Sequence, residues 1–299
     1  MLVGDISIGI RLRLTEAGHR NPPHGGLGMN SGLEDALAVS WRLSAILKGY
    51  GGPHLIPSYE AEQRPTMITR LERCNHHVCE HGPRYQWFAE QGPEILMAED
   101  EKGNQLRKQI KDQLDNSGSE ILDRGIELDS RYKSAVIYQD GMEEPEWAFK
   151  KYVPSTFPGS RAPHVFLKDG KTSILDTYGL EFSLIEFTYR SGAVTSQEFV
   201  DVAKEMGMHL KSVVLKDEEH AHRIWGSNLV LVRADGHVAW RGQQPPERDA
   251  LREILEVVTG QKAFPGYVPA KPRVINIEGM LDSSESSSQT EILPLGETL

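Results

Sequence analysis

A succession of short apolar runs and helical patterns begins at Val165, and it constrains the fold of this chain more than any other feature. The runs read HVFLKDG, SLIEFT, SVVL and LVLVRADGHVAW, and turn-forming residues such as glycine and aspartate bound them. Runs of this kind predict β-strands, while helical periodicity predicts helices over 196–206 and 246–258. The run HAHRIW, with His220 and His222, is expected to be a surface strand edge or a loop. The expected order is strand, helix, strand, strand pair, helix.

This order predicts an α/β fold with a mixed sheet of the thioredoxin type. The sequence RADG is the expected hairpin turn between the strands LVLV and HVAW. We place the start of this unit between Pro154 and Gly159, which predicts a domain over 154–262. Residues 263–299 are rich in proline, serine and acidic side chains, a composition that predicts disorder.

The first 153 residues read as a different unit. A glycine-rich loop leads into a helical pattern from Leu33 that stops at Gly49, and a second helical pattern runs over 65–88. The stretch 98–130 is strongly polar and predicts a charged helix that covers a surface.

Composition limits the partners of the chain. Its 299 residues carry a formal net charge of -10, without a lysine and arginine run interleaved with aromatic residues. A nucleic-acid partner is therefore not expected. The expected partner is a small molecule or another protein. No apolar run approaches the roughly 18 residues needed to cross a bilayer, so we expect a cytoplasmic protein without membrane contact. The two cysteines, Cys74 and Cys79, are too few for a disulfide framework.

The run PPHGGLGMNSG has the character of a ligand-binding turn. It places Gly25, Gly26 and Gly28 before a helix, and Ser31 with Glu34 predicts a capping box at the start of that helix. Glycines let a backbone approach a planar ligand closely, and a helix N-terminus presents amide groups to an anionic edge. These are the features needed to hold a reduced flavin, whose pyrimidine end carries negative charge.

Three segments then match one family. LVGD at the N-terminus, AGHRNPPHGGLGMNSGLEDALAVSWRLSAILKG at 17–49 and LIPSYEAEQRP at 55–65 resemble the second flavin motif of the FAD-dependent aromatic hydroxylases, the class of p-hydroxybenzoate hydroxylase and phenol hydroxylase. The later segments GIELDSRYKSAVI, PGSRAPHVFLKDGKTSILDTYG and LVLVRADGHVAWRG are similar to the phenol hydroxylase branch. The resemblance implies that 1–153 is a helical remnant of the FAD-binding domain and that a thioredoxin-like domain follows it.

The resemblance also implies roles for single residues. Asp5, after Gly4, would accept a hydrogen bond from the ribityl chain of FAD, and Pro22 or Pro23 would lie beside the reactive edge of the isoalloxazine. The pyrimidine side would meet the backbone of the following turn. The cofactor-binding residues implied in this way are Gly4, Asp5, Pro22, Pro23, Gly25, Gly26, Leu27, Gly28, Met29 and Asn30. Asp35 and Trp41 are interpreted as structural, and no catalytic residue is identified.

The activity implied by the resemblance is the hydroxylation of a phenol or another small aromatic molecule. In the family, NAD(P)H reduces the flavin, oxygen adds to form a flavin C4a-hydroperoxide, and that species transfers one oxygen atom to the ring. The thioredoxin-like domain serves for structure and subunit contacts there, which implies a possible homodimer.

Two departures from the family pattern lie near the N-terminus. Ile6 to Glu16, reading ISIGIRLRLTE, separates Asp5 from the turn that it directly precedes in the family. The dinucleotide-binding pattern G-x-G-x-x-G after a strand has no match in the sequence. We therefore expect a truncated hydroxylase, inactive as an isolated chain.

Other functions are weighed against this one. The run RCNHHVCEHG places Cys74, His77 and His81 on one helix face, but no second ligand pair is evident, so a solvated or interfacial helix is preferred and no metal is expected. Neither cysteine lies in the thioredoxin-like domain, which excludes thiol–disulfide exchange there. The sequence has no G-x-S-x-G and no H-E-x-x-H motif. The alternative function is a non-catalytic module for protein association.

Overall fold

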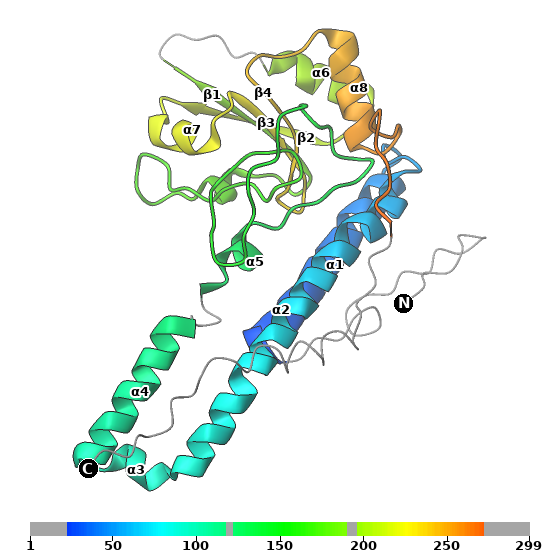
Figure 1. Ribbon diagram of the computed structural model, residues 1–299. Helices are drawn as coiled ribbons and strands as arrows, with labels where there is room; N and C mark the ends of the chain where they lie inside the picture. The colour runs from blue at the N-terminus through cyan, green and yellow to red at the C-terminus, as the bar shows by residue number, and fades with distance from the viewer. Residues whose placement is uncertain (1–22, 118–121, 190–195, 272–299) are drawn as a thin grey trace.

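The computed structural model describes residues 23–117, 122–189 and 196–271. A short 3-10 turn, η2 (His24–Gly26), leads directly into α1 (Leu27–Leu47), and α1 packs antiparallel beside the longer α2 (Leu55–Gln91). Among the described residues, three more α-helices follow before the sheet, α3 (Pro93–Met97), α4 (Glu101–Ser117) and α5 (Arg124–Leu128), and a 3-10 turn, η4 (Ile174–Thr177), comes just before the first strand. Figure 1 shows α3, α4 and the end of α2 as an arm that extends away from the sheet.

The second part of the chain is built on a four-stranded sheet with the order β2-β1-β3-β4. The strands are β1 (Phe182–Thr188), β2 (Leu210–Lys216), β3 (Leu229–Val232) and β4 (Val238–Gly242). β1 and β2 are parallel and joined through α6 (Gln197–Glu205), whereas β3 is antiparallel to β1 and to β4. Helix α7 (Glu219–Trp225) precedes β3, and α8 (Arg248–Val258) follows β4. The mixed sheet of the thioredoxin type is therefore confirmed, as is the RADG hairpin turn.

Both faces of the sheet are covered by apolar side chains. Leu184 points to one face, where it joins a cluster with α6, α8 and the C-terminal half of α1. Its neighbour Ile185 points to the other face, where Ala221 and Trp225 of α7 pack. Because Trp41 and Ala45 of α1 belong to the first cluster, the helical part and the sheet share one core. The domain limits 1–153, 154–262 and 263–299 remain predictions.

Two local expectations for the second part of the chain are wrong. HAHRIW forms most of helix α7, since Ala221 and Trp225 lie one turn apart and face the sheet, and Gly226 ends the helix in the left-handed conformation. HVFLKDG forms no regular strand, because the carboxylate of Asp169 accepts hydrogen bonds from the amides of Lys171 and Thr172 and closes a tight turn. Only an isolated bridge between Phe166 and Ser173 remains there. Across the described ranges, no helix is long and apolar enough to cross a membrane.

Candidate functional site

The predicted flavin turn folds as a tight approach to the start of α1. The amide of Gly26 donates to the carbonyl oxygen of Pro23 at 3.1 Å, and this bond closes the turn. Gly25 (φ 80°) and Gly26 (φ 64°) both adopt the left-handed conformation that side chains disfavour. The two glycines therefore allow the chain to reverse and to enter α1 at Leu27 without strain.

Among the described residues, nothing covers the outer side of this turn. A Cβ atom built on Gly26 meets no heavy atom of these residues within 4 Å, whereas one on Gly25 meets the His77 ring at 3.6 Å. The backbone at Gly26 can therefore be approached from outside, while the other side of the turn rests on α2. The first-turn amide groups of an α-helix have no acceptor within the helix, so those of α1 lie at the same opening. This combination fits a flat ligand with an anionic edge, as a reduced flavin requires.

The start of α1 differs from the prediction. Helix α1 begins at Leu27 behind Gly26, which has no side chain that could cap it, so Ser31 and Glu34 lie inside the helix. Both side chains are bound by Arg70 of α2 instead: its guanidinium donates a hydrogen bond to Ser31 Oγ at 3.1 Å and forms an ion pair with Glu34 Oε2 at 2.6 Å. The predicted capping box is therefore wrong, and the two residues join α1 to α2.

A buried group of ion pairs lies beside the glycine turn, on the side that faces α2. Asp123 accepts from Arg73 at 2.5 and 2.7 Å and contacts His77 Nε2 at 2.7 Å. Burial works to raise the pKa of the Asp123 carboxyl, but the hydrogen bonds from Arg73 and His77 outweigh it and lower the pKa. Asp123 is thus held as a carboxylate, and it fixes the His77 ring beneath Gly25.

The same contacts help to decide whether Cys74, His77 and His81 could form a zinc site. Cys74 and His77 are buried and the exposed Cys79 faces another way, so this part of α2 is interfacial rather than solvated. Within the described part of the chain, no group of three or more histidine, cysteine, aspartate or glutamate side chains could hold a metal ion.

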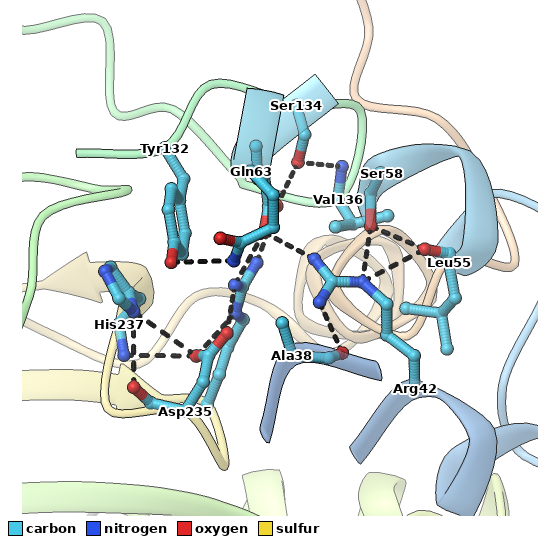
Figure 2. A network of polar contacts seen from close by, with 12 residues as sticks. Ala38, Arg42, Leu55, Ser58, Gln63, Tyr132, Ser134, Val136, Asp235 and His237 are labelled. Carbon is cyan, nitrogen blue, oxygen red and sulfur yellow. Dashed lines mark hydrogen bonds and ion pairs between the residues drawn. The ribbon is translucent and has the colours of Figure 1, made fainter. Parts of the chain in front are cut away.

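The C-terminal half of α1 is held by a second buried network, shown in Figure 2. Glu62 of α2 lies at its centre and is fully buried, together with Arg42 and Arg233. Arg233, from the RADG turn, donates to both oxygens of Glu62 at 2.8 Å, and Arg42 of α1 donates to Oε2 at 2.5 Å. Ser134 adds a hydrogen bond to Oε1 at 2.6 Å.

Asp235 extends this network within the hairpin turn. It accepts from Arg233 at 2.5 and 3.1 Å and from the Trp41 indole nitrogen at 3.1 Å, so α1 is tied directly to the sheet. His237 lies beside Asp235 and stacks on Tyr132, with ring centroids 3.9 Å apart. The interpretation of Trp41 as a core residue is confirmed, and so is the structural reading of Asp35, which is buried and bonded to the Tyr59 hydroxyl.

The charges of this network are balanced. Burial works to raise the pKa values of Glu62 and Asp235, but the guanidinium of Arg233 outweighs it for both groups and lowers them, that of Asp235 well below its usual range. Arg42 adds to the effect on Glu62. Both carboxyl groups are therefore held in the charged form, where they face the guanidinium of Arg233.

The structure brings together one continuous part of the predicted cofactor-binding set. Pro23 and the six residues 25–30 lie together at the N-terminus of α1, whereas Gly4, Asp5 and Pro22 lie outside the described residues. The sequence reasoning did not single out Arg70, Asp123 or Glu62. Their charges are spaced along polar segments without a motif, and only their burial reveals them.

Comparisons with known proteins agree with this picture. An FAD-binding domain model matches residues 15–73, and a model described as aromatic-ring hydroxylase, C-terminal, matches residues 155–261. The FAD-dependent monooxygenase apdD of Emericella nidulans is 34% identical over 252 residues, and phenol 2-monooxygenase of a Pseudomonas species is 28% identical over 283 residues. These alignments cover 82% and 86% of this chain.

A solved structure gives the same result. The rebeccamycin biosynthetic enzyme RebC with reduced flavin superposes with a TM-score of 0.70 at 33% identity, over 85% of this chain. The chain spans less than half the length of these proteins: 40% of the Emericella protein, 45% of the Pseudomonas protein and 46% of the RebC chain.

Proposed function

Since the chain carries the C-terminal domain of the aromatic-ring hydroxylases and matches their FAD-binding domain, we propose that it forms the isoalloxazine side of the flavin site in an FAD-dependent aromatic monooxygenase. The reaction is the hydroxylation of a phenol or another small aromatic substrate, with NAD(P)H as the reductant. Names of relatives such as phenol 2-monooxygenase and 2,4-dichlorophenol 6-monooxygenase support this substrate class.

The observation that carries the proposal is the open glycine turn before α1. No described residue covers the outer side of Gly26, and the amide groups of the first helical turn lie beside it. Amide groups at a helix N-terminus stabilise negative charge by about 0.3–1 kcal/mol at exposed positions. Bound there, reduced FAD would supply the activation of oxygen, which no protein side chain can provide.

The residues of this chain have positioning roles in the proposal. Pro23 and the backbone of 25–30 lie against the flavin, and Gly4, Asp5 and Pro22 remain predicted contacts. His77 and Arg70 hold the turn and the start of α1 against α2. We expect the chain alone to bind flavin weakly and to lack hydroxylase activity, because the residues proposed here contact only one side of the cofactor.

A matched pair of glycine variants tests the proposal. Gly26→Ala and Gly49→Ala both replace a left-handed glycine with open space around it, one at each end of α1. Each variant is expected to lose about 1–2 kcal/mol of stability from backbone strain. Only Gly26→Ala also places a methyl group where the flavin would lie, so its Kd for FAD should rise at least tenfold. Titration of flavin fluorescence measures this, and equal affinities for both variants would contradict the proposal.

The same purified chain distinguishes the proposed monooxygenase from the alternative function. A purified chain that takes up flavin supports the monooxygenase. A colourless chain that binds no flavin at any FAD concentration and forms a stable dimer supports a module for protein association, with the thioredoxin-like sheet as its framework.

A further inference from the structure

The two edges of the four-stranded sheet differ. At one edge, β4 is covered by other segments of this chain: Gly159 and Ser160 exchange backbone hydrogen bonds with Val238 at 2.7 and 2.9 Å, and the amide of Tyr138 donates to the carbonyl oxygen of Ala239 at 2.9 Å. β2 forms the opposite edge, and within the described part of the chain no strand pairs with its outer side. One edge of the sheet is therefore closed, and the other is open among these residues.

The hydrogen bonds of β2 show which of its residues face outward. The backbone groups of successive residues in a strand point to opposite sides. The amide of Asp217 donates to the carbonyl oxygen of Thr188 in β1 at 2.9 Å, so Asp217 and every second residue before it point toward β1. The residues between them point away from the sheet: Leu210, Ser212, Val214 and Lys216. Their amides and carbonyl groups form the open edge.

β2 has few of the features that usually protect an edge strand, which are prolines, bulges and lysines directed at the edge. It pairs with β1 over seven residues in one unbroken register, and its sequence LKSVVLK contains no proline. The ammonium group of Lys211 is turned toward its own chain, where it donates to the carbonyl oxygen of Tyr178 at 3.3 Å. Val214 is 40% exposed. A regular edge of this kind is a template for another strand.

The side chains of β2 are complementary to a second copy of the same strand. An antiparallel pair of identical strands is closed by a two-fold axis. With that axis at Val213, every residue of β2 has a counterpart in the other copy. Lys211 then lies opposite Leu215, and Lys216 lies opposite Leu210, so no lysine faces a lysine. Like charges directly opposite each other, which would destabilise the pair, are therefore avoided.

The backbone groups match in the same register. Ser212 of one copy lies opposite Val214 of the other, and both residues point outward, so each pair can exchange two hydrogen bonds. We propose that this chain forms a homodimer in which two β2 strands pair antiparallel about Val213 and join the two sheets into one. The pairing concerns the sheet and does not depend on the proposed flavin site.

The first test is the association of the full chain, measured by sedimentation velocity over a range of concentrations. A monomer–dimer equilibrium is expected. Val214→Pro removes an amide that points outward, while the amides of β2 that bond to β1 keep their hydrogen, and edge strands tolerate proline at such positions. Its dimer Kd should rise about tenfold or more, because two hydrogen bonds across the two-fold axis are lost. Val214→Thr, which keeps the amide, is the matched control, and its Kd should stay near that of the unchanged chain.

Disulfide crosslinking tests the register and does not depend on the proline variant. Cys79→Ser first removes the exposed thiol, and Val213→Cys or Val214→Cys is then added. In the proposed pair the two copies of residue 213 are direct neighbours, with Cβ atoms about 4.5–5.5 Å apart, whereas the two copies of residue 214 are diagonal at about 7–8 Å. A disulfide needs Cβ atoms about 3.5–4.5 Å apart. Mild oxidation should therefore crosslink Val213→Cys much faster than Val214→Cys.

Four results would overturn the proposal. The chain could remain monomeric at every concentration that sedimentation can measure, or its dimer could be unaffected by Val214→Pro. Crosslinking of Val214→Cys at the rate of Val213→Cys or faster would contradict the register. Slow hydrogen exchange of the Ser212 and Val214 amides in the monomer would show that the chain itself covers this edge.

The dimer and the proposed function fail separately. A dimer that behaves as expected but takes up no FAD keeps the β2 pairing and removes the flavin site. Flavin uptake by a chain that stays monomeric keeps the flavin site and removes the pairing.

Discussion

Replacing Arg233 should test whether the buried network holds the sheet to the helices. Arg233→Met removes the guanidinium that donates to both oxygens of Glu62 at 2.8 Å and to Asp235 at 2.5 and 3.1 Å. Arg42 then remains as the only guanidinium of the network, on the far side of Glu62. Asp235 keeps the Trp41 indole and backbone contacts but no guanidinium.

The expected loss of stability in Arg233→Met follows from the burial of these side chains. Arg233 and Glu62 have no exposed side-chain surface, and Asp235 is 5% exposed, so water cannot replace the lost bonds. Removing one partner from a buried ion pair costs about 3–5 kcal/mol. Arg248→Met is the matched control, because Arg248 lies on α8 with 46% of its side chain exposed and pairs with Glu205. An exposed pair contributes about 0–1 kcal/mol.

Urea unfolding followed by far-UV circular dichroism measures both variants. A double variant with Glu62→Met added to Arg233→Met gives the coupling between the two residues, which should be about 0.5–3 kcal/mol because they are in direct contact. If Arg233→Met loses no more stability than Arg248→Met, or if the effects of the two buried substitutions simply add, the argument from buried charge is wrong.

Three further outcomes follow from the same contacts. The pKa values of Glu62 and Asp235 are lowered in the folded state. Their contribution to stability is therefore fully present above the ordinary pKa values near 4, and it is lost as the pH falls through the lowered values. In Arg233→Met this contribution is reduced, so acid unfolding followed by fluorescence should begin at higher pH. Trp41→Phe removes the bond to Asp235, leaves a buried acceptor with one partner fewer, and should lower the free energy of unfolding by about 1–3 kcal/mol in a urea titration. Added zinc should leave the Tm of the chain unchanged, because His77 is already bound to a buried carboxylate; a zinc-dependent rise would contradict this.

The sheet was predictable because its signals are local. Each strand of LVLVRADGHVAW is a short apolar run, and the turn between them carries Gly236 with a positive φ of 78°. The sequence does not reveal which residues that turn contacts. Charged residues in a hairpin turn normally face water, yet Arg233 is buried against Glu62, 171 residues earlier in the chain, and the Asp235 side chain that pairs with it is only 5% exposed.

Helix α7 has a signal in the sequence that indicates a helix. Ala221 and Trp225 stand four residues apart before Gly226, the spacing of one helical face followed by a C-terminal stop. The two histidines of HAHRIW favour an exposed position, and the prediction of a strand edge or a loop followed from them. For the capping box the error was different: Ser31 and Glu34 have the right spacing, but a left-handed glycine five residues earlier starts the helix first.

Of the candidate site, the turn and its glycines could be predicted, whereas its support could not. The motif around Gly25 and Gly26 is contiguous, so the sequence displays it. Asp123 is separated from His77 by 46 residues and lies in a polar stretch that gives no sign of burial. Contacts of that range depend on how α2 and the segment before α5 pack, which is a property of the tertiary structure.

These contacts give the thioredoxin-like sheet a role that needs no cysteine. Helix α1 is fixed near its N-terminus by Arg70, which binds Ser31 and Glu34, and near its C-terminal half by Arg42, whose partner Glu62 is bound by the hairpin turn of the sheet. Each attachment includes a directional hydrogen bond donated by a guanidinium group, so the two restrict rotation of α1 as well as its distance from α2. The rotation of α1 decides which way its first-turn amides point and which face it presents to solvent. The sheet therefore contributes to the candidate site by setting the orientation of the helix from which the turn projects.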